Sequence, residues 1–215
     1  MKMVASFQKL GPHRFIGHLD LQRAMQRALR RADIPVVYSQ GFNPHLLLSF
    51  AAPLSVGIEG EHEVMELPLQ NNITETEFVE KMNAVLPQGM KVVAAKLVTD
   101  DTAPAMARLA AAVYHISAEN GFQALEAALP GFMNQSTIPY LKKTKSGERM
   151  DDFRPLVYNL TLKDGVLQAV LAITQQGTAK PDQLMGLLCA HAGMAVPRLS
   201  IKRARLLDER FAPLV

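Results

Sequence analysis

The 215-residue sequence contains a single cysteine, no tryptophan and no long hydrophobic run. One cysteine cannot form an internal disulfide or a Cys-x-x-Cys zinc or redox site. Cys189 lies in an apolar helical pattern, where a cysteine acts as a small buried hydrophobe. No apolar stretch approaches the roughly 18 residues of a membrane-spanning helix, and the N-terminus lacks the apolar segment of a signal peptide. We therefore expect a protein of the reducing cytoplasm rather than a secreted or membrane protein.

The common catalytic motifs are also absent. The sequence has no glycine-rich phosphate loop, no His-Glu-x-x-His zinc helix and no Gly-x-Ser-x-Gly nucleophile turn. The histidines show no metal-ligand spacing. From the residues alone we expect neither a metal nor a cofactor in this chain.

Composition points to a folded, mildly basic protein. Hydrophobic residues make up 48% and charged residues 20%, which is typical of globular domains. The net charge is +3 and the isoelectric point is about 9.0, which favours an anionic partner only weakly. The length suits one large domain or two domains of about 100 residues each.

The expected order of elements repeats once along the chain. The first half predicts strand, helix, strand, strand, helix, strand, and the second half predicts the same order after a polar boundary at residues 100–108. Thr74 and Glu77 fit a helix capping box, and Asp164-Gly165 fits a two-residue hairpin turn. We therefore predict the α+β class, with two tandem ferredoxin-like units (β-α-β-β-α-β), antiparallel sheets and helices on one face. The units are expected at 1–99 and 109–215. The expected strands are 3–9, 46–51, 61–69, 90–98, 109–118, 156–163, 166–174 and 198–207, and the expected helices are 19–31, 74–86, 121–129 and 180–192.

The stretch at residues 14–50 is the most informative. A helix is expected from about Leu19 to Arg31, because its apolar residues recur at three- and four-residue spacing and share one face. Arginines occupy roughly the opposite face, with Asp20 beside them. The apolar positions are Leu21, Met25, Ala28, Leu29 and Ala32, and the arginines are Arg23, Arg27, Arg30 and Arg31.

A loop with two aromatics and a histidine follows this helix at residues 38–45. Single-stranded RNA sites combine such groups, because bases stack on flat side chains and phosphates pair with arginine. We therefore predict an RNA- or partner-binding site in this stretch. Its residues are Arg14, His18, Asp20, Arg23, Arg27, Arg30, Tyr38, Ser39, Gly41, Phe42, Asn43 and His45.

A second basic cluster lies at residues 140–154. It is predicted to be a loop or hairpin tip, and either a solvated connection or an arm that contacts phosphates. Asp151 and Asp152 partly offset its charge. The basic residues assigned to binding here are Lys142, Lys143, Lys145, Arg149 and Arg154. The acidic residues of an earlier strand, Glu59, Glu61, Glu63 and Glu66, are expected on a solvated face.

Catalysis is the weaker of two readings of the first cluster. His18, His45 and Tyr38 are candidate general acids and bases for an RNA phosphodiester, with an arginine stabilising phosphate charge. Nothing in the sequence requires that these groups meet. Binding without chemistry is therefore favoured.

The pattern RFxxHLDLxRAxxRALRRAxxPVxYSxGFNPH, followed by SFAxPLxxG, resembles the radical-SAM-linked family of bacterial proteins of unknown function. The later KKTKxGE stretch fits the same family. Members occur alone or fused to the C-terminus of a B12-binding-type radical SAM enzyme. The resemblance implies a radical SAM partner that carries an iron–sulfur cluster and SAM, since this chain lacks the three-cysteine motif. By architectural analogy alone, two tandem ferredoxin-like units are also similar to the RAMP proteins that process CRISPR RNA.

The leading expectation is an RNA-binding or substrate-recruiting accessory protein that works with a radical SAM enzyme in RNA or ribosome modification. One alternative is a metal-independent endoribonuclease or RNA-modifying enzyme that uses His18, His45 and Tyr38. Another is a module that docks the radical SAM partner and binds no nucleic acid.

Overall fold

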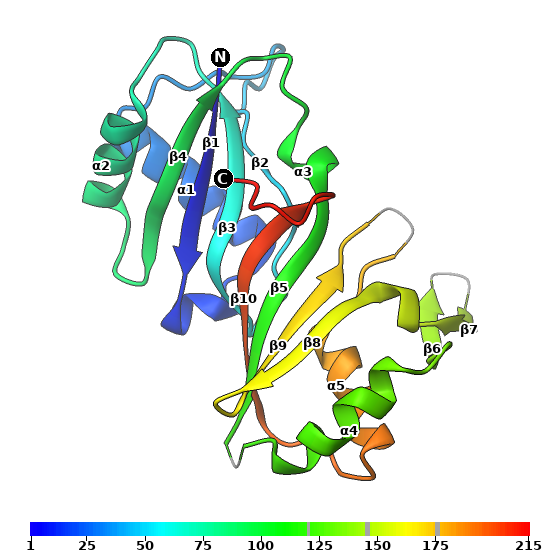
Figure 1. Ribbon diagram of the computed structural model, residues 1–215. Helices are drawn as coiled ribbons and strands as arrows, with labels where there is room; N and C mark the ends of the chain where they lie inside the picture. The colour runs from blue at the N-terminus through cyan, green and yellow to red at the C-terminus, as the bar shows by residue number, and fades with distance from the viewer. Residues whose placement is uncertain (120, 145–146, 175–176) are drawn as a thin grey trace. The chain divides into compact units, whose positions relative to one another are not determined.

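A computed structural model describes residues 1–119, 121–144, 147–174 and 177–215 (Figure 1). The chain forms two units. Unit 1 contains Met1–Leu109 and Arg203–Val215, and unit 2 contains Ala110–Lys202. Each unit combines helices with antiparallel strands, which confirms the predicted α+β class.

In unit 1, three long antiparallel strands pair in the order β4-β1-β3, and the short strand β2 pairs with β3. The C-terminal strand β10 lies beside β3 through its residues from Arg203 onward. Helices α1 and α2 pack together and cover one face of the β4-β1-β3 strands (Figure 1). The bounds are β1 Lys2–Lys9, η1 Gly11–Phe15, α1 His18–Arg31, β2 Ser49–Phe50, β3 Glu59–Pro68, α2 Glu75–Val85, β4 Met90–Val98, α3 Ala105–Arg108 and β10 Leu199–Asp208.

Helix α1 folds as its periodicity predicts. Leu21, Met25, Ala28 and Leu29 are buried and belong to one core with residues of the sheet and of α2. The helix ends at Arg31, four residues before Pro35, which disfavours its continuation. At the start of α2, the Glu77 amide donates to the Thr74 hydroxyl at 3.2 Å, which confirms that Thr74 caps this helix.

In unit 2, the strand order is β10-β5-β9-β8, with β10 contributing Leu199–Lys202. Asp164 and Gly165 join β8 to β9 with φ angles of 51° and 75°, which confirms the predicted hairpin turn. Helices α4 and α5 pack against each other. The bounds are β5 Leu109–Ala118, α4 Gln123–Met133, β6 Pro139–Thr144, β7 Gly147–Asp152, η2 Arg154–Leu156, β8 Val157–Lys163, β9 Val166–Ala172 and α5 Pro181–His191.

Two predicted elements differ clearly from the observed ones, and a third takes one of its two predicted forms. The strand expected at 46–51 is only Ser49–Phe50, because Leu46 instead forms a bridge with Tyr38. The basic segment, predicted to be a loop or a hairpin tip, forms the hairpin, as the antiparallel ribbon β6–β7. Helix α4 starts two residues later than predicted and continues to Met133, past an internal proline.

A buried charge cluster lies inside unit 1 on β1, β3 and β10. The Arg203 guanidinium makes a two-point ion pair with the Glu63 carboxylate, and both residues are 3% exposed. Arg203 also donates to the carbonyls of Ala52 and Pro53, at 3.2 and 3.1 Å. Lys9, which is 1% exposed, donates to the Ile16 carbonyl at 3.1 Å. Two cations and one anion are thus shielded from water, so the hydrogen bonds must offset a large desolvation cost.

The prediction that the acidic residues of β3 lie on a solvated face is wrong for Glu63 and Glu66. The Glu66 carboxylate accepts from the Lys2 ammonium at 2.9 Å and from the Ala105 amide at 2.7 Å. Glu66 is 8% exposed, so it belongs to the interior of unit 1. Residues 63–67 of β3 are all buried, so both faces of the strand are covered there and each of these carboxylates lies in the interior.

Replacing Lys9 with methionine should remove a pH dependence of stability. Burial lowers the pKa of Lys9 below 10.5, an effect that Glu63 opposes and Arg203 reinforces. Between the lowered pKa and 10.5, the unfolded chain binds a proton that the folded chain has released, so the stability of the wild type should rise with pH. Urea unfolding between pH 7 and pH 10 measures this. The free energy of unfolding of the wild type, minus that of Lys9→Met, should increase with pH. A difference that stays constant would contradict a lowered pKa of Lys9.

Candidate nucleic-acid interface

Helix α1 exposes four arginines opposite its buried face: Arg23, Arg27, Arg30 and Arg31. Arg23 pairs with Asp20 at 3.1 Å, and both side chains are about two-thirds exposed, so water competes for this contact. Arg31 donates to the Val85 carbonyl at 3.1 Å. Within the part of the chain that the structure describes, no ion pair involves Arg27 or Arg30. Two guanidinium groups are therefore available to an external anion.

The two flanks of α1 border different hollows. On the side of α2, Arg27 and Arg31 line a hollow of about 260 Å³ together with Leu86 and Met90. On the other side, Arg30 lines a hollow of about 400 Å³ together with Tyr38. The structure thus brings together Arg30 and Tyr38, two residues that the sequence assigned to one site.

The loop that follows α1 is a closed hairpin. Tyr38 and Leu46 form a bridge, and the Ser39 amide donates to the His45 carbonyl at 2.8 Å. The Gln26 amide reaches from α1 to the Leu46 carbonyl at 3.3 Å, which holds the stem beside the helix. The tip, residues 40–44, is exposed throughout. The loop predicted from its aromatic and turn-forming residues is therefore a hairpin, and its stem is held beside the helix that carries the arginines.

Phe42 stands at the tip with its side chain fully exposed. Gly41 before it has a φ of +119°, a conformation that other residues rarely adopt, and Asn43 follows it in the exposed turn. In the isolated protein, a fully exposed phenylalanine gains none of the stabilisation that burial of its ring would provide. Its position is instead suited to stacking on a flat partner such as a nucleobase.

Ser39 fixes the ring of His45. The Ser39 hydroxyl and the His45 Nδ1 lie 2.7 Å apart, and the same oxygen accepts the His45 amide proton at 3.0 Å. The hydrogen bond at Nδ1 leaves Nε2 as the nitrogen that can meet an external group. His45 therefore presents Nε2, rather than Nδ1, to an external group.

Arg14 in η1 and His18 at the start of α1 already have partners. The Arg14 guanidinium lies 4.9 Å from the centre of the exposed Phe15 ring and donates to Glu59 at 3.3 Å. The ring of His18 meets the edge of Phe50, with centroids 5.5 Å apart. Among the described contacts, none joins His18 to His45 or Tyr38. The proposed catalytic grouping of these three residues thus remains a prediction.

The second basic cluster lies in unit 2, and two of its basic side chains share the carboxylate of Asp151. Lys142 on β6 and Asp151 on β7 form an ion pair at 2.8 Å, which raises the pKa of Lys142 and lowers the pKa of Asp151. Arg149 approaches the same carboxylate at 3.5 Å. Lys145 and the side chain of Lys143 lie outside the described residues. The ribbon also pairs Leu141 with Met150, and both side chains are at least half exposed.

Arg154 has a structural position. Its Nε donates to the Met133 carbonyl at 3.1 Å, and its Nη1 donates to the Val157 carbonyl at 2.8 Å. These carbonyls belong to the end of α4 and the start of β8. The guanidinium therefore ties two elements of unit 2 together.

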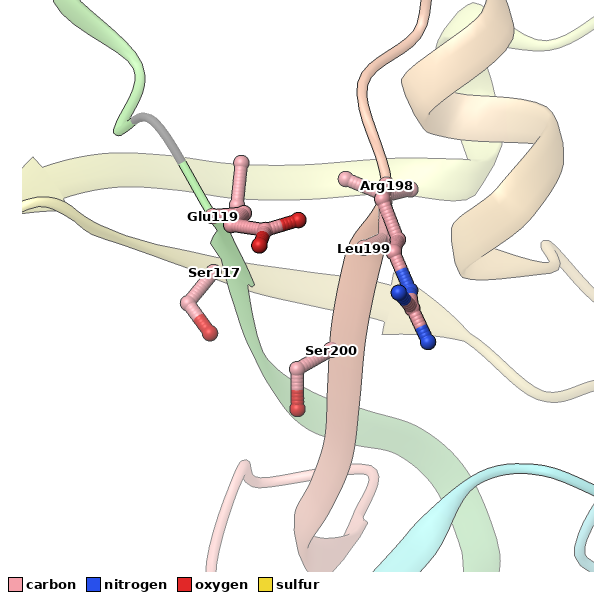
Figure 2. Close-up of a pocket in the computed structure, with 6 residues that line it drawn as sticks. Ser117, Glu119, Arg198, Leu199 and Ser200 are labelled. Atoms are coloured by element: carbon pink, nitrogen blue, oxygen red, sulfur yellow. The ribbon is translucent and has the colours of Figure 1, made fainter.

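A polar hollow of about 270 Å³ in unit 2 had no sequence signal. It lies where β5 ends and β10 begins and is lined by Ser117, Glu119, Arg198 and Ser200. Figure 2 shows the Glu119 carboxylate directed toward the strand that carries Arg198 and Leu199. Single polar residues at strand ends look like ordinary solvated positions in a sequence. Only the pairing of strands distant in the chain brings these four together.

Two kinds of feature are absent from the described part of the chain. No group of three or more His, Cys, Asp or Glu side chains is placed to hold a metal ion. No helix is both long and apolar enough to cross a membrane.

Residues 2–181 match the model of a family described as uncharacterized protein conserved in bacteria (DUF2344). The chain belongs to this family. A search of the curated proteins found no match. The DUF2344 match includes all of α1, the hairpin and the β6–β7 ribbon, so the candidate interface lies within the family region.

Proposed function

We propose that this DUF2344 protein binds RNA and presents it to a radical SAM enzyme. Unit 1 offers guanidinium groups to phosphates and exposed rings to bases. Single-stranded RNA needs both kinds of contact, since its affinity comes from backbone charge and base stacking together. Electrostatic attraction by exposed arginines also speeds encounter with an anionic strand.

One observation supports the proposal most. Arg27 and Arg30 point outward without an internal ion-pair partner among the described residues, and the neighbouring hairpin holds Phe42 fully in solvent. Neither feature stabilises unit 1 by itself. An RNA strand would supply the missing anions and the missing stacking partner.

Replacing Arg27 and Arg30 together with alanine should weaken RNA binding at least about tenfold, because charge-assisted contacts are worth roughly 1 kcal/mol or more each. The slope of log affinity against log salt should fall by about 1.4, since each phosphate contact to a single strand contributes about 0.7. Fluorescence anisotropy with a labelled RNA at several salt concentrations measures both quantities.

Lys163→Ala with Lys180→Ala is the matched control, because these exposed side chains in unit 2 carry the same total charge. Equal loss in both double variants would mean that only net charge matters, and unchanged binding in Arg27/Arg30 would refute the interface. The RNA from these mixtures should remain intact on a denaturing gel. Discrete fragments that disappear in His45→Ala would instead favour the ribonuclease alternative.

The link to a radical SAM enzyme rests on the resemblance of the stretch at residues 14–57. A tagged chain should recover a protein with an iron–sulfur cluster from its own cells, and nuclease treatment should reduce the yield if RNA joins the two. Recovery that survives nuclease and high salt would favour the docking alternative. Recovery of no such enzyme would remove this part of the proposal.

We further propose that both units are ferredoxin-like and that the protein works in the cytoplasm. The order β4-β1-β3-β2 in unit 1 and β10-β5-β9-β8 in unit 2 supports the fold assignment, because both place the first and third strands at the centre. The single, buried cysteine suits a reducing compartment.

A further inference from the structure

The hollow at the C-terminal end of α1 contains four kinds of polar group. Arg30, Asp33, Tyr38 and Gln70 line it, and residues 34–36 form an apolar part of its wall. Its volume of about 400 Å³ lies within the usual range for small-molecule sites, about 300–1,000 Å³. A guanidinium, a carboxylate, a phenol ring and a carboxamide thus surround one space that is large enough for a nucleotide.

Backbone hydrogen bonds hold the walls of the hollow in place. Val36 forms a bridge with Leu69, and the Gln70 amide donates to the Pro35 carbonyl at 2.8 Å. The Ile34 amide donates to the Leu29 carbonyl at 3.1 Å, which fixes the chain as it leaves α1. Ile34 and Val36 are both 5% exposed and are anchored in the core. The hollow is therefore preformed rather than made by loose surface side chains.

Asp33 lies in the turn that follows α1. Its φ is 50°, in the left-handed region that glycine adopts most readily and that Asp and Asn also tolerate. The helix dipole disfavours its negative charge at the C-terminal end of α1, and Arg30 and Arg31 of the last turn offset this effect. Among the described contacts, no ion pair or side-chain hydrogen bond uses its carboxylate. A carboxylate that lines a hollow and has no such partner is available to a ligand that donates hydrogen bonds.

The polar groups match one nucleobase best. Guanine presents two adjacent donors, N1–H and the exocyclic amino group, which suit the two oxygens of a carboxylate. Adenine and cytosine have only one exocyclic amino group on that edge, and uracil has a single N–H. Tyr38 can stack on the ring, Gln70 can donate to O6, and Arg30 can pair with the adjacent phosphate.

We propose that this hollow binds a guanine base of the RNA, with Asp33 reading its Watson–Crick edge. The inference rests on the proposed function and specifies it: the strand would be held by α1 and selected by one base. Asp33 is thus a specificity residue, whereas Arg27 contributes affinity without regard to sequence.

The test compares four labelled nine-nucleotide RNAs, which are uridine throughout except for G, A, C or U at the centre. The wild type should bind the G strand about tenfold more tightly than the others, as expected for one two-point base contact. Asp33→Asn keeps the shape and tolerates the left-handed conformation but places an N–H against guanine donors. It should lose the G preference and keep its affinity for the all-U strand.

Each outcome separates the two proposals. Equal binding of all four strands, or a G preference that persists in Asp33→Asn, would overturn the guanine site and leave RNA binding intact. Failure to bind any strand would refute the proposed function. Binding of guanosine 5′-monophosphate, measured by saturation-transfer NMR, then tests the site independently of RNA binding. A signal that is stronger than that of adenosine 5′-monophosphate and is lost in Asp33→Asn supports the site. Equal signals from the two nucleotides, or a signal unchanged in Asp33→Asn, overturn it.

Discussion

Replacing Arg203 with alanine is expected to lower the free energy of unfolding by about 3–5 kcal/mol, the cost of leaving one member of a buried ion pair alone. Glu63 would keep a negative charge in a site where it is 3% exposed, and the carbonyls of Ala52 and Pro53 would lose their donor. Lys9 lies close enough to offset part of this charge. Urea denaturation followed by circular dichroism measures the change.

Arg205→Ala is the matched control for this prediction. Arg205 lies two residues further along β10 and is exposed, so its loss should change stability by no more than about 0.5 kcal/mol. The triple variant Lys9→Met, Glu63→Leu and Arg203→Met removes all three buried charges and should be far less destabilised than Arg203→Ala. If Arg203→Ala and Arg205→Ala lost equal stability, the buried pair would have no special importance.

The second large effect is expected from Arg154→Ala, which should cost about 2–4 kcal/mol of stability and leave RNA affinity unchanged. The lost side chain makes two charge-assisted hydrogen bonds to main-chain carbonyls, each worth about 1.5–3 kcal/mol at most. Urea unfolding and anisotropy on the same protein samples give both quantities, below the temperature at which the variant begins to unfold.

Arg149→Ala provides the comparison in the same segment. Arg149 is exposed and only 3.5 Å from its carboxylate, so its removal should barely change stability. A loss of RNA affinity in Arg154→Ala without a loss of stability would restore the phosphate-contacting role that the sequence suggested. The opposite pattern would establish Arg154 as a tie between α4 and β8.

The features that the sequence predicted well are those that depend on neighbours in the chain. The apolar face of α1, the Thr74 cap and the Asp164-Gly165 turn each require contacts within a few residues, so their patterns are legible. The same holds for the exposure of the arginines, since they share one helix with the buried apolar face. Periodicity alone placed Arg27 and Arg30 on the exposed side.

The features that escaped prediction depend on distant partners. Glu63 on an alternating strand reads as solvated, and its burial follows only from Arg203, which lies 140 residues later. Asp33 reads as an ordinary turn residue until its φ angle and the hollow beside it are known. In the same way, Arg154 reads as one more basic residue until the carbonyls of Met133 and Val157 are found around it.

The assignment of Arg203–Val215 to unit 1 has a consequence for synthesis on the ribosome. After β3 has been synthesised, Glu63 lacks the Arg203 guanidinium that neutralises it until the nascent chain reaches residue 203. Unit 1 would therefore wait, incompletely folded, while all of unit 2 is translated. A premature stop codon anywhere in the gene segment for unit 2 should then yield not a stable half-protein but a substrate for proteases.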